Sequence, residues 1–171
     1  MSLTHFDFEA PPTVLVVDDR PVLADLLRSF LSKQGMVALP AYSTQQCLEK
    51  AEQGAVDVIV VGLVMSGIDG LEVCAALKET SLTRSIPVVL LTDRNDMATR
   101  LAAMKLGVSE LVLRPIRVQD LLARIQIHLE WSCKVREMDR VLTQEMLRGN
   151  YDFLPKLRQS EDKRERDGKR M

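Results

Sequence analysis

Hydrophobic and polar positions follow two alternating patterns between residues 13 and 113. Short runs that are apolar at nearly every position predict strands buried on both faces, and segments with an apolar residue every three or four positions predict helices. The predicted strands are 13–17, 36–39, 57–61, 87–91 and 110–113. The predicted helices are 21–33, a segment capped by Ser43 that runs to 53, 71–78, and a segment capped by Asn95 that runs to 106. This order predicts the α/β class, with a doubly wound five-stranded parallel sheet.

The C-terminal third carries a different pattern, because neither proline nor glycine occurs between Pro115 and Gly149. Residues 116–148 are therefore expected to form one extended helix whose first half covers the sheet. Its second half keeps an apolar residue every three or four positions among charged ones, which favours a partner-facing stripe and a homodimer. That stripe consists of Val135, Met138, Leu142 and Met146. The alternative is a frayed helical linker that leads to another part of the protein.

These patterns divide the chain into an N-terminal arm (1–12), a domain (13–129), a helical extension (130–149) and a tail (150–171) that is expected to be disordered. Hydrophobic residues make up 46% of the chain, charged residues 27%, and the net charge is −1. This balance is typical of a soluble globular protein and gives no global reason to bind nucleic acid or a membrane. A basic excess in the tail leaves DNA binding as a weaker hypothesis.

Apolar runs are too short for a membrane span and the first residues contain no export signal, so a cytoplasmic location is expected. The cysteines, Cys47, Cys74 and Cys133, are odd in number and widely spaced. They are therefore expected to be reduced, buried or partly buried thiols rather than a disulfide framework or a metal site.

Candidate chemistry lies directly after the predicted strands, because a doubly wound sheet places its site at the carboxyl ends of its strands. The residues there are Asp18, Asp19, Gly62, Thr92, Asp93 and Arg114. Adjacent carboxylates repel one another unless a cation lies between them, and their hard oxygen ligands suit Mg²⁺. A helix N-cap before Pro21 and an ion pair with Arg114 are the structural alternatives for this acidic pair.

Four segments in order, "VLVVDD", "DVIVVGLVMSGIDGLEV", "IPVVLLT" and "SELVLRPI", resemble the receiver domain of bacterial two-component response regulators over residues 13–129. The steps from Asp19 to position 62, then to Thr92 and Arg114, are 43, 30 and 22 residues, as in that family. The resemblance implies the flavodoxin-like receiver fold. It also implies that an Asp at position 62 would accept a phosphoryl group, beside Mg²⁺ held by Asp18, Asp19 and the carbonyl of Val64. The Thr92 hydroxyl and a Lys at position 114 would contact the phosphate.

This chain departs from the receiver pattern at several positions of that pocket. Gly62 removes the phosphoacceptor, Arg114 replaces Lys, and Asp93 stands where a small residue is usual. Ser66 replaces the loop proline and Leu111 the aromatic switch residue. The resemblance therefore implies a degenerate pseudo-receiver with no catalytic residue, no cofactor or at most weakly bound Mg²⁺ at Asp18, Asp19 and Val64.

Such a pseudo-receiver would be a non-catalytic protein-interaction and dimerisation module of bacterial signal transduction. Its partners would be signalling proteins or an output domain, engaged through the face formed by residues 95–106, the fifth strand and the following helix. Arg114 is expected to pair with Asp18, Asp19 or Asp93, unless its head group reaches water instead. The alternative function is a phosphorylation-dependent switch that regulates an output domain, with Gly62 introduced by engineering or phosphate taken by Asp93 or Asp18.

Overall fold

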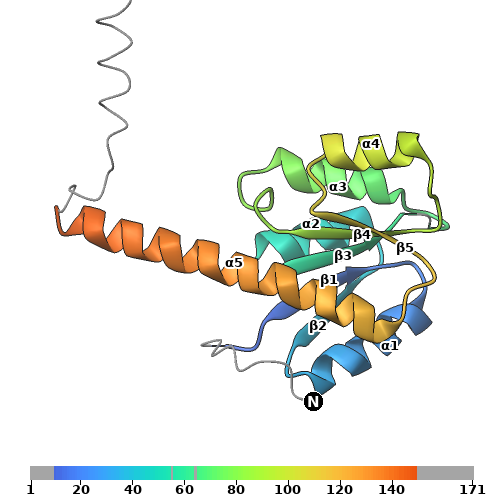
Figure 1. Ribbon diagram of the computed structural model, residues 1–171, viewed down its shortest axis with the longest axis horizontal. Helices are drawn as coiled ribbons and strands as arrows, with labels where there is room; N and C mark the ends of the chain where they lie inside the picture. The colour runs from blue at the N-terminus through green and yellow to red at the C-terminus, as the bar shows by residue number, and fades with distance from the viewer. Residues whose placement is uncertain (1–9, 55, 64, 150–171) are drawn as a thin grey trace, which may run out of the picture. The chain divides into compact units, whose positions relative to one another are not determined.

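The computed structural model describes residues 10–54, 56–63 and 65–149, which form a parallel sheet covered by helices on both faces (Figure 1). The strands are β1 (Thr13–Val17), β2 (Val37–Ala41), β3 (Val58–Gly62), β4 (Val88–Thr92) and β5 (Glu110–Leu113). The helices are α1 (Pro21–Lys33), α2 (Thr44–Glu52), α3 (Gly70–Glu79), α4 (Met97–Lys105) and α5 (Val118–Leu147). The chain divides into two units, Met1–Cys133 and Lys134–Met171. The predicted fold class and the long C-terminal helix are confirmed.

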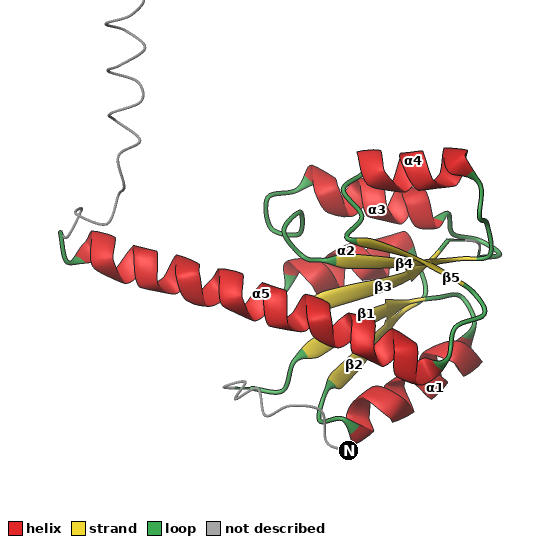
Figure 2. Ribbon diagram, viewed as in Figure 1, coloured by secondary structure: helices red, strands yellow, loops and turns green. Residues whose placement is uncertain are grey.

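Strand order is β2–β1–β3–β4–β5, and every neighbouring pair is parallel. Successive strand residues point to opposite faces, so Val14 and Val58 pack with α1 and α5, whereas Leu15 and Ile59 pack with α2 and α3. Figure 2 shows these two helical layers on either side of the strands. The order reverses between β1 and β3, and the carboxyl ends of these two strands therefore border the crevice where such folds place their sites.

The first turns of α5 bury four apolar side chains against the sheet: Leu121, Leu122, Ile125 and Leu129. A polar cluster adds to this attachment, because Glu110 at the start of β5 contacts both Arg124 and His128 of α5. The Nε2 of His128 lies 2.9 Å from Glu110, and burial, followed by the charge of Arg124, lowers the pKa of this histidine. The imidazole is thus neutral near pH 7 and donates to the carboxylate.

Two local predictions were wrong. Strand β2 continues through Pro40 to Ala41 instead of ending at 39. Val37 donates to the carbonyl of Pro12, and alternation along a parallel strand turns the nitrogen of Pro40 to the open edge of the sheet, where no donor is needed. Asp96, not Asn95, caps α4: its carboxylate accepts from the backbone N–H of Thr99 at 2.8 Å and from the Thr99 hydroxyl at 2.9 Å. The cap predicted at Ser43 is confirmed.

Cys47 and Cys74 are buried and free, and burial raises the pKa of each thiol to about 12, so both are inert. Among the described residues, no helix combines the length and the apolar character that a membrane span requires. The predicted tail (150–171), most of the predicted arm (1–12) and Val64 lie outside the described residues.

Candidate functional site

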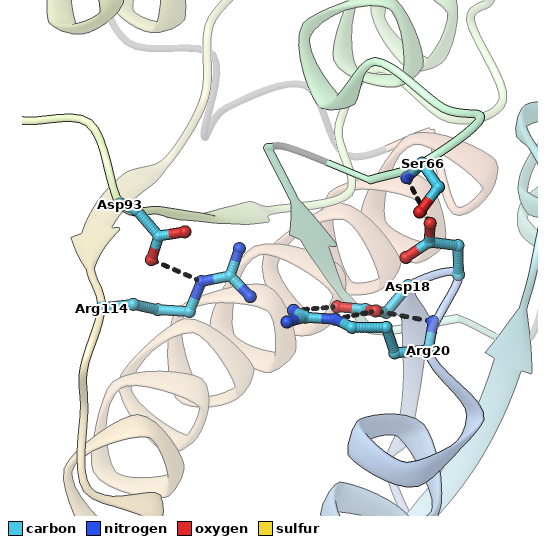
Figure 3. A network of polar contacts seen from close by, with 6 residues as sticks. Asp18, Arg20, Ser66, Asp93 and Arg114 are labelled. Atoms are coloured by element: carbon cyan, nitrogen blue, oxygen red, sulfur yellow. Dashed lines mark hydrogen bonds and ion pairs between the residues drawn. The ribbon is translucent and has the colours of Figure 1, made fainter.

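The residues that the sequence singled out end four neighbouring strands. Asp18 and Asp19 follow β1, Gly62 is the last residue of β3, Thr92 is the last of β4, and Arg114 follows β5. Because parallel strands end at the same edge of the sheet, the fold brings these positions into one pocket. Figure 3 shows the polar contacts of Asp18 and Arg114 there.

Asp18 is buried, and its partner is Arg20, which sequence reasoning missed. The Asp18 side chain is 3% exposed. The guanidinium of Arg20 donates to Oδ1 through Nε at 3.0 Å and to Oδ2 through Nη2 at 3.2 Å, and the backbone N–H of Arg20 donates to Oδ1 at 2.9 Å. This forked contact raises the pKa of Arg20. The buried acid therefore has three donors from one residue, in the bidentate geometry that arginine favours.

Asp19 is bound from the β3–α3 loop. Its Oδ2 accepts the backbone N–H of Ser66, and this hydrogen bond is the main reason why the pKa of Asp19 lies below its ordinary value. The resemblance to receivers implies a proline at position 66, and proline has no N–H to donate. Serine at this position restores a backbone N–H, and this difference is the feature of the sequence from which the hydrogen bond to Asp19 could have been predicted.

Position 62 faces the buried acid directly. A Cβ built on Gly62 would lie 3.2 Å from Oδ2 of Asp18 and 3.4 Å from Cγ of Met65. The backbone of β3 therefore points its side-chain position into the acidic pocket, as a phosphoacceptor would require, but glycine provides no carboxylate there. Residue 62 therefore offers no side-chain nucleophile and no side-chain ligand.

Arg114 pairs with Asp93, one of the three acids that the sequence offered it. Its Nε lies 3.3 Å from Oδ1 of Asp93, close enough for an ion pair although the angle is not that of a hydrogen bond. The Arg114 side chain is 14% exposed and that of Asp93 69%. Figure 3 shows the guanidinium of Arg114 extending from the β5 side toward the Asp18–Arg20 pair. The prediction that Arg114 pairs with an acid of this pocket agrees with this geometry. Asp18 pairs with Arg20 instead of Arg114.

Thr92 is fully buried, and its hydroxyl accepts the backbone N–H of Arg94 at 2.9 Å. This contact holds the turn between β4 and α4 closed. Leu111, at the aromatic switch position of receivers, is partly buried and packs against the core on the side of α2 and α3. Thr92 therefore stabilises a turn, and Leu111 contributes to the packing of the core.

A cavity of about 360 Å³ lies beside the acidic pocket, between the β3–α3 loop and the β4–α4 turn. Met65, Ile68 and Asp69 line it from one side and Arg94 from the other. Asp69 is occupied as the N-cap of α3, accepting from Leu71 at 2.9 Å. Among the described residues, no three histidine, cysteine or carboxylate side chains gather where they could hold a metal ion.

These features define a class: a five-stranded doubly wound domain with an acidic pair at its switch point. The sequence profile of the response regulator receiver domain matches residues 14–126. The chain belongs to this family, whose members are the signalling modules of two-component systems.

Relatives with assigned names are regulators of this family. The sensory transduction protein RegX3 of Mycolicibacterium smegmatis is 31% identical over 114 residues, which is 67% of this chain and 49% of that protein. The transcriptional regulatory protein YvrH of Bacillus subtilis is 29% identical over 126 residues, 73% of this chain and 52% of that protein. The chain spans about half the length of these relatives.

Solved structures agree on the fold. The chemotaxis protein CheY4 of Vibrio cholerae superposes with a TM-score of 0.66 at 24% identity, covering 70% of this chain and 100% of that one. A CheY-like receiver domain protein of Methanospirillum hungatei gives a TM-score of 0.67 at 18% identity, covering 73% of this chain and 98% of that one.

Proposed function

We propose that this chain is a pseudo-receiver: a non-catalytic protein-interaction module that signals without phosphorylation at position 62. The observation that carries this proposal is Gly62 itself, whose missing side chain would enter the pocket 3.2 Å from the Asp18 carboxylate. The other acids do not replace it. Asp18 is held by Arg20, and Asp93 is paired with Arg114, so neither is free for the in-line attack that phosphoryl transfer requires.

The proposed interaction face includes α4 and lies on the side where receivers contact their outputs. Met97, Leu101 and Met104 are 69%, 47% and 73% exposed, and their spacing places them on one side of the helix. An apolar stripe of this kind is typical of a protein-binding surface. Without a phosphorylation-driven switch, this face would be presented constantly or controlled by a binding partner in the cytoplasm.

Phosphorylation provides the direct test. The protein is incubated with a small phosphodonor and Mg²⁺, or with beryllofluoride and Mg²⁺, and is examined by intact mass and by amide NMR spectra. We expect no added phosphoryl mass and no widespread shifts, because position 62 has no carboxylate to attack the phosphodonor. An adduct or a spectrum-wide change would contradict the proposal and favour a phosphorylated switch. A receiver that retains its Asp serves as the positive control.

The C-terminal part of α5 is proposed to form a homodimer through the stripe of Val135, Met138, Leu142 and Met146. These side chains are 45%, 64%, 38% and 50% exposed in the single chain. Val135, Met138 and Leu142 occupy successive a, d and a positions of a heptad pattern, and Val141 and Met146 flank them at g and e. A second copy of the chain would cover all of them with the same surface.

Charges beside the stripe favour a parallel pair. Lys134 is at g and Asp139 at the following e, five residues later, which is the spacing that joins opposite charges across a parallel coiled coil. In an antiparallel pair, g positions face g and e positions face e. Lys134 would therefore lie opposite Lys134 or Val141 of the second copy. The parallel arrangement would bring the domains of the two copies side by side. The paired helices would form a stalk that transmits the state of these domains to a partner or output domain.

Sedimentation equilibrium tests the dimer. Truncation after residue 129 and Leu142→Asp are expected to give monomers, because each removes apolar area from the seam, whereas Gln144→Asp on the opposite side of the helix should remain dimeric. Lys134→Asp and Asp139→Lys should each weaken the dimer roughly threefold, and the double exchange should restore it. A monomeric full chain would refute the dimer, and failure of the double exchange to restore it would refute the parallel arrangement.

A further inference from the structure

The residues around Asp18 and Asp19 do not fit the magnesium site that the receiver family implies. Both oxygens of Asp18 accept hydrogen bonds from Arg20, and Oδ2 of Asp19 accepts one from Ser66. The third carboxylate of the family's ligand set is absent because residue 62 is glycine. A hard divalent cation needs several free oxygen ligands, and protein donors already occupy three of the four carboxylate oxygens of Asp18 and Asp19.

We infer that Arg20 and the Ser66 N–H act as built-in replacements for the divalent cation, so that the acidic pocket is closed without metal or phosphate. Arg20 supplies the positive charge and the fork that satisfies the buried Asp18. The backbone N–H of Ser66, which exists because proline is absent there, ties Asp19 to the β3–α3 loop in the way a shared metal ion would.

This inference deepens the proposed function and rests on it, because it says how a receiver pocket can stay in one state. The acids that would repel one another in an empty pocket are held by donors from two different segments, the turn after β1 and the loop after β3. Arg114 completes the arrangement from β5 by pairing with Asp93. Each of the three acids therefore has its own partner within the chain.

Binding of Mn²⁺ and Mg²⁺ alone tests the inference without any phosphodonor. In the wild-type protein, Mn²⁺ should cause no selective broadening of the amides around Asp18 and Asp19, and Mg²⁺ should give no saturable shifts up to tens of millimolar. The double variant Arg20→Ala, Ser66→Pro frees the carboxylates and should bind Mg²⁺ at least about tenfold more tightly than the wild type. Mn²⁺ should then broaden the amides around the pocket.

Matched controls separate the two donors from general effects. Ser66→Ala keeps the backbone N–H and removes only the hydroxyl, whose hydrogen bond affects Asp19 less than the N–H does, so metal binding should change far less than in the double variant. Arg28→Ala removes an exposed arginine that pairs with Asp25 on α1, and should also change nothing at the pocket. Far-UV circular dichroism and thermal melting establish that each variant is folded before titration.

Selective Mn²⁺ broadening at Asp18 and Asp19 in the wild type would overturn the inference, whatever the variants do. So would a folded double variant whose metal affinity equals that of the wild type. If the double variant does not fold, the Mg²⁺ affinity of the single variant Arg20→Ala is compared with that of the wild type in its place. A wild type that binds Mg²⁺ but accepts no phosphate would overturn this inference alone, whereas a phosphoryl adduct would overturn the proposed function.

Discussion

Replacing Gly70 with alanine is expected to destabilise the domain by about 3 kcal/mol, the upper range for adding a methyl group to a tightly packed position. A Cβ at this position would lie 2.2 Å from the carbonyl oxygen of Gly62 and 2.8 Å from Cα of Leu63. Both atoms belong to the backbone, so no side-chain rotation can relieve the contact. The Gly70 N–H also donates to the carbonyl of Leu63 at 3.1 Å, and a shift of α3 away from β3 would break this bond.

Urea unfolding of Gly70→Ala beside Gly67→Ala measures this effect. The loop that precedes α3 contains Gly67, where an added Cβ would meet nothing within 4 Å, so its replacement should change the free energy of unfolding by less than about 0.5 kcal/mol. Equal stability of the two variants would show that the loop backbone moves freely, and the geometry of position 62 would then not be fixed by close packing against α3.

The fold could be predicted from the pattern of apolar residues because the central strands β1, β3 and β4 are buried on both faces and the helices each bury one apolar side. Strand β3 illustrates this: residues 58–62 are all buried, and the sequence shows an unbroken apolar run there. The ends of the strands were predicted less accurately than the strands themselves. The second strand was predicted to end at 39, yet it continues through Pro40 to Ala41, because an edge strand has one side on which no donor is needed.

The site was predictable in its location but only partly in its contacts. Spacing along the chain placed Asp18, Gly62 and Arg114 at one edge of the sheet, since strand ends converge whatever the side chains do. Arg20 was missed because the acidic pair suggested a metal ion, although a basic residue two positions after Asp18 was visible. The Ser66 contact uses a backbone donor, and side-chain motifs do not reveal these. Asn95 and Asp96 both have side chains suited to cap a helix. Asp96 is the cap in the structure, where its carboxylate also accepts a hydrogen bond from the Thr99 hydroxyl.

Restoring the carboxylate by Gly62→Asp is expected to cost about 1–3 kcal/mol of stability rather than to rebuild a working receiver. The new Cβ meets Asp18 Oδ2 at 3.2 Å, the same oxygen that accepts from Arg20 Nη2 at 3.2 Å. The added carboxylate would then lie among Asp18, Asp19 and Asp93 with no new cation to offset it. Urea unfolding of Gly62→Ala, Gly62→Asn and Gly62→Asp separates the three contributions, because urea adds no salt that would screen the charges.

Alanine reports the contact of the Cβ alone, asparagine adds the volume of the side chain, and aspartate adds its charge. The aspartate variant should be less stable than the asparagine variant by about 1 kcal/mol or more at pH 7, because like charges at short range disfavour ionisation. This difference should narrow as the pH falls and the carboxylates take up protons. Equal stability at pH 7 would mean that Arg20 and Arg114 can balance a further acid. The pocket would then tolerate a carboxylate at position 62, and repulsion among its acids would not be what disfavours one there.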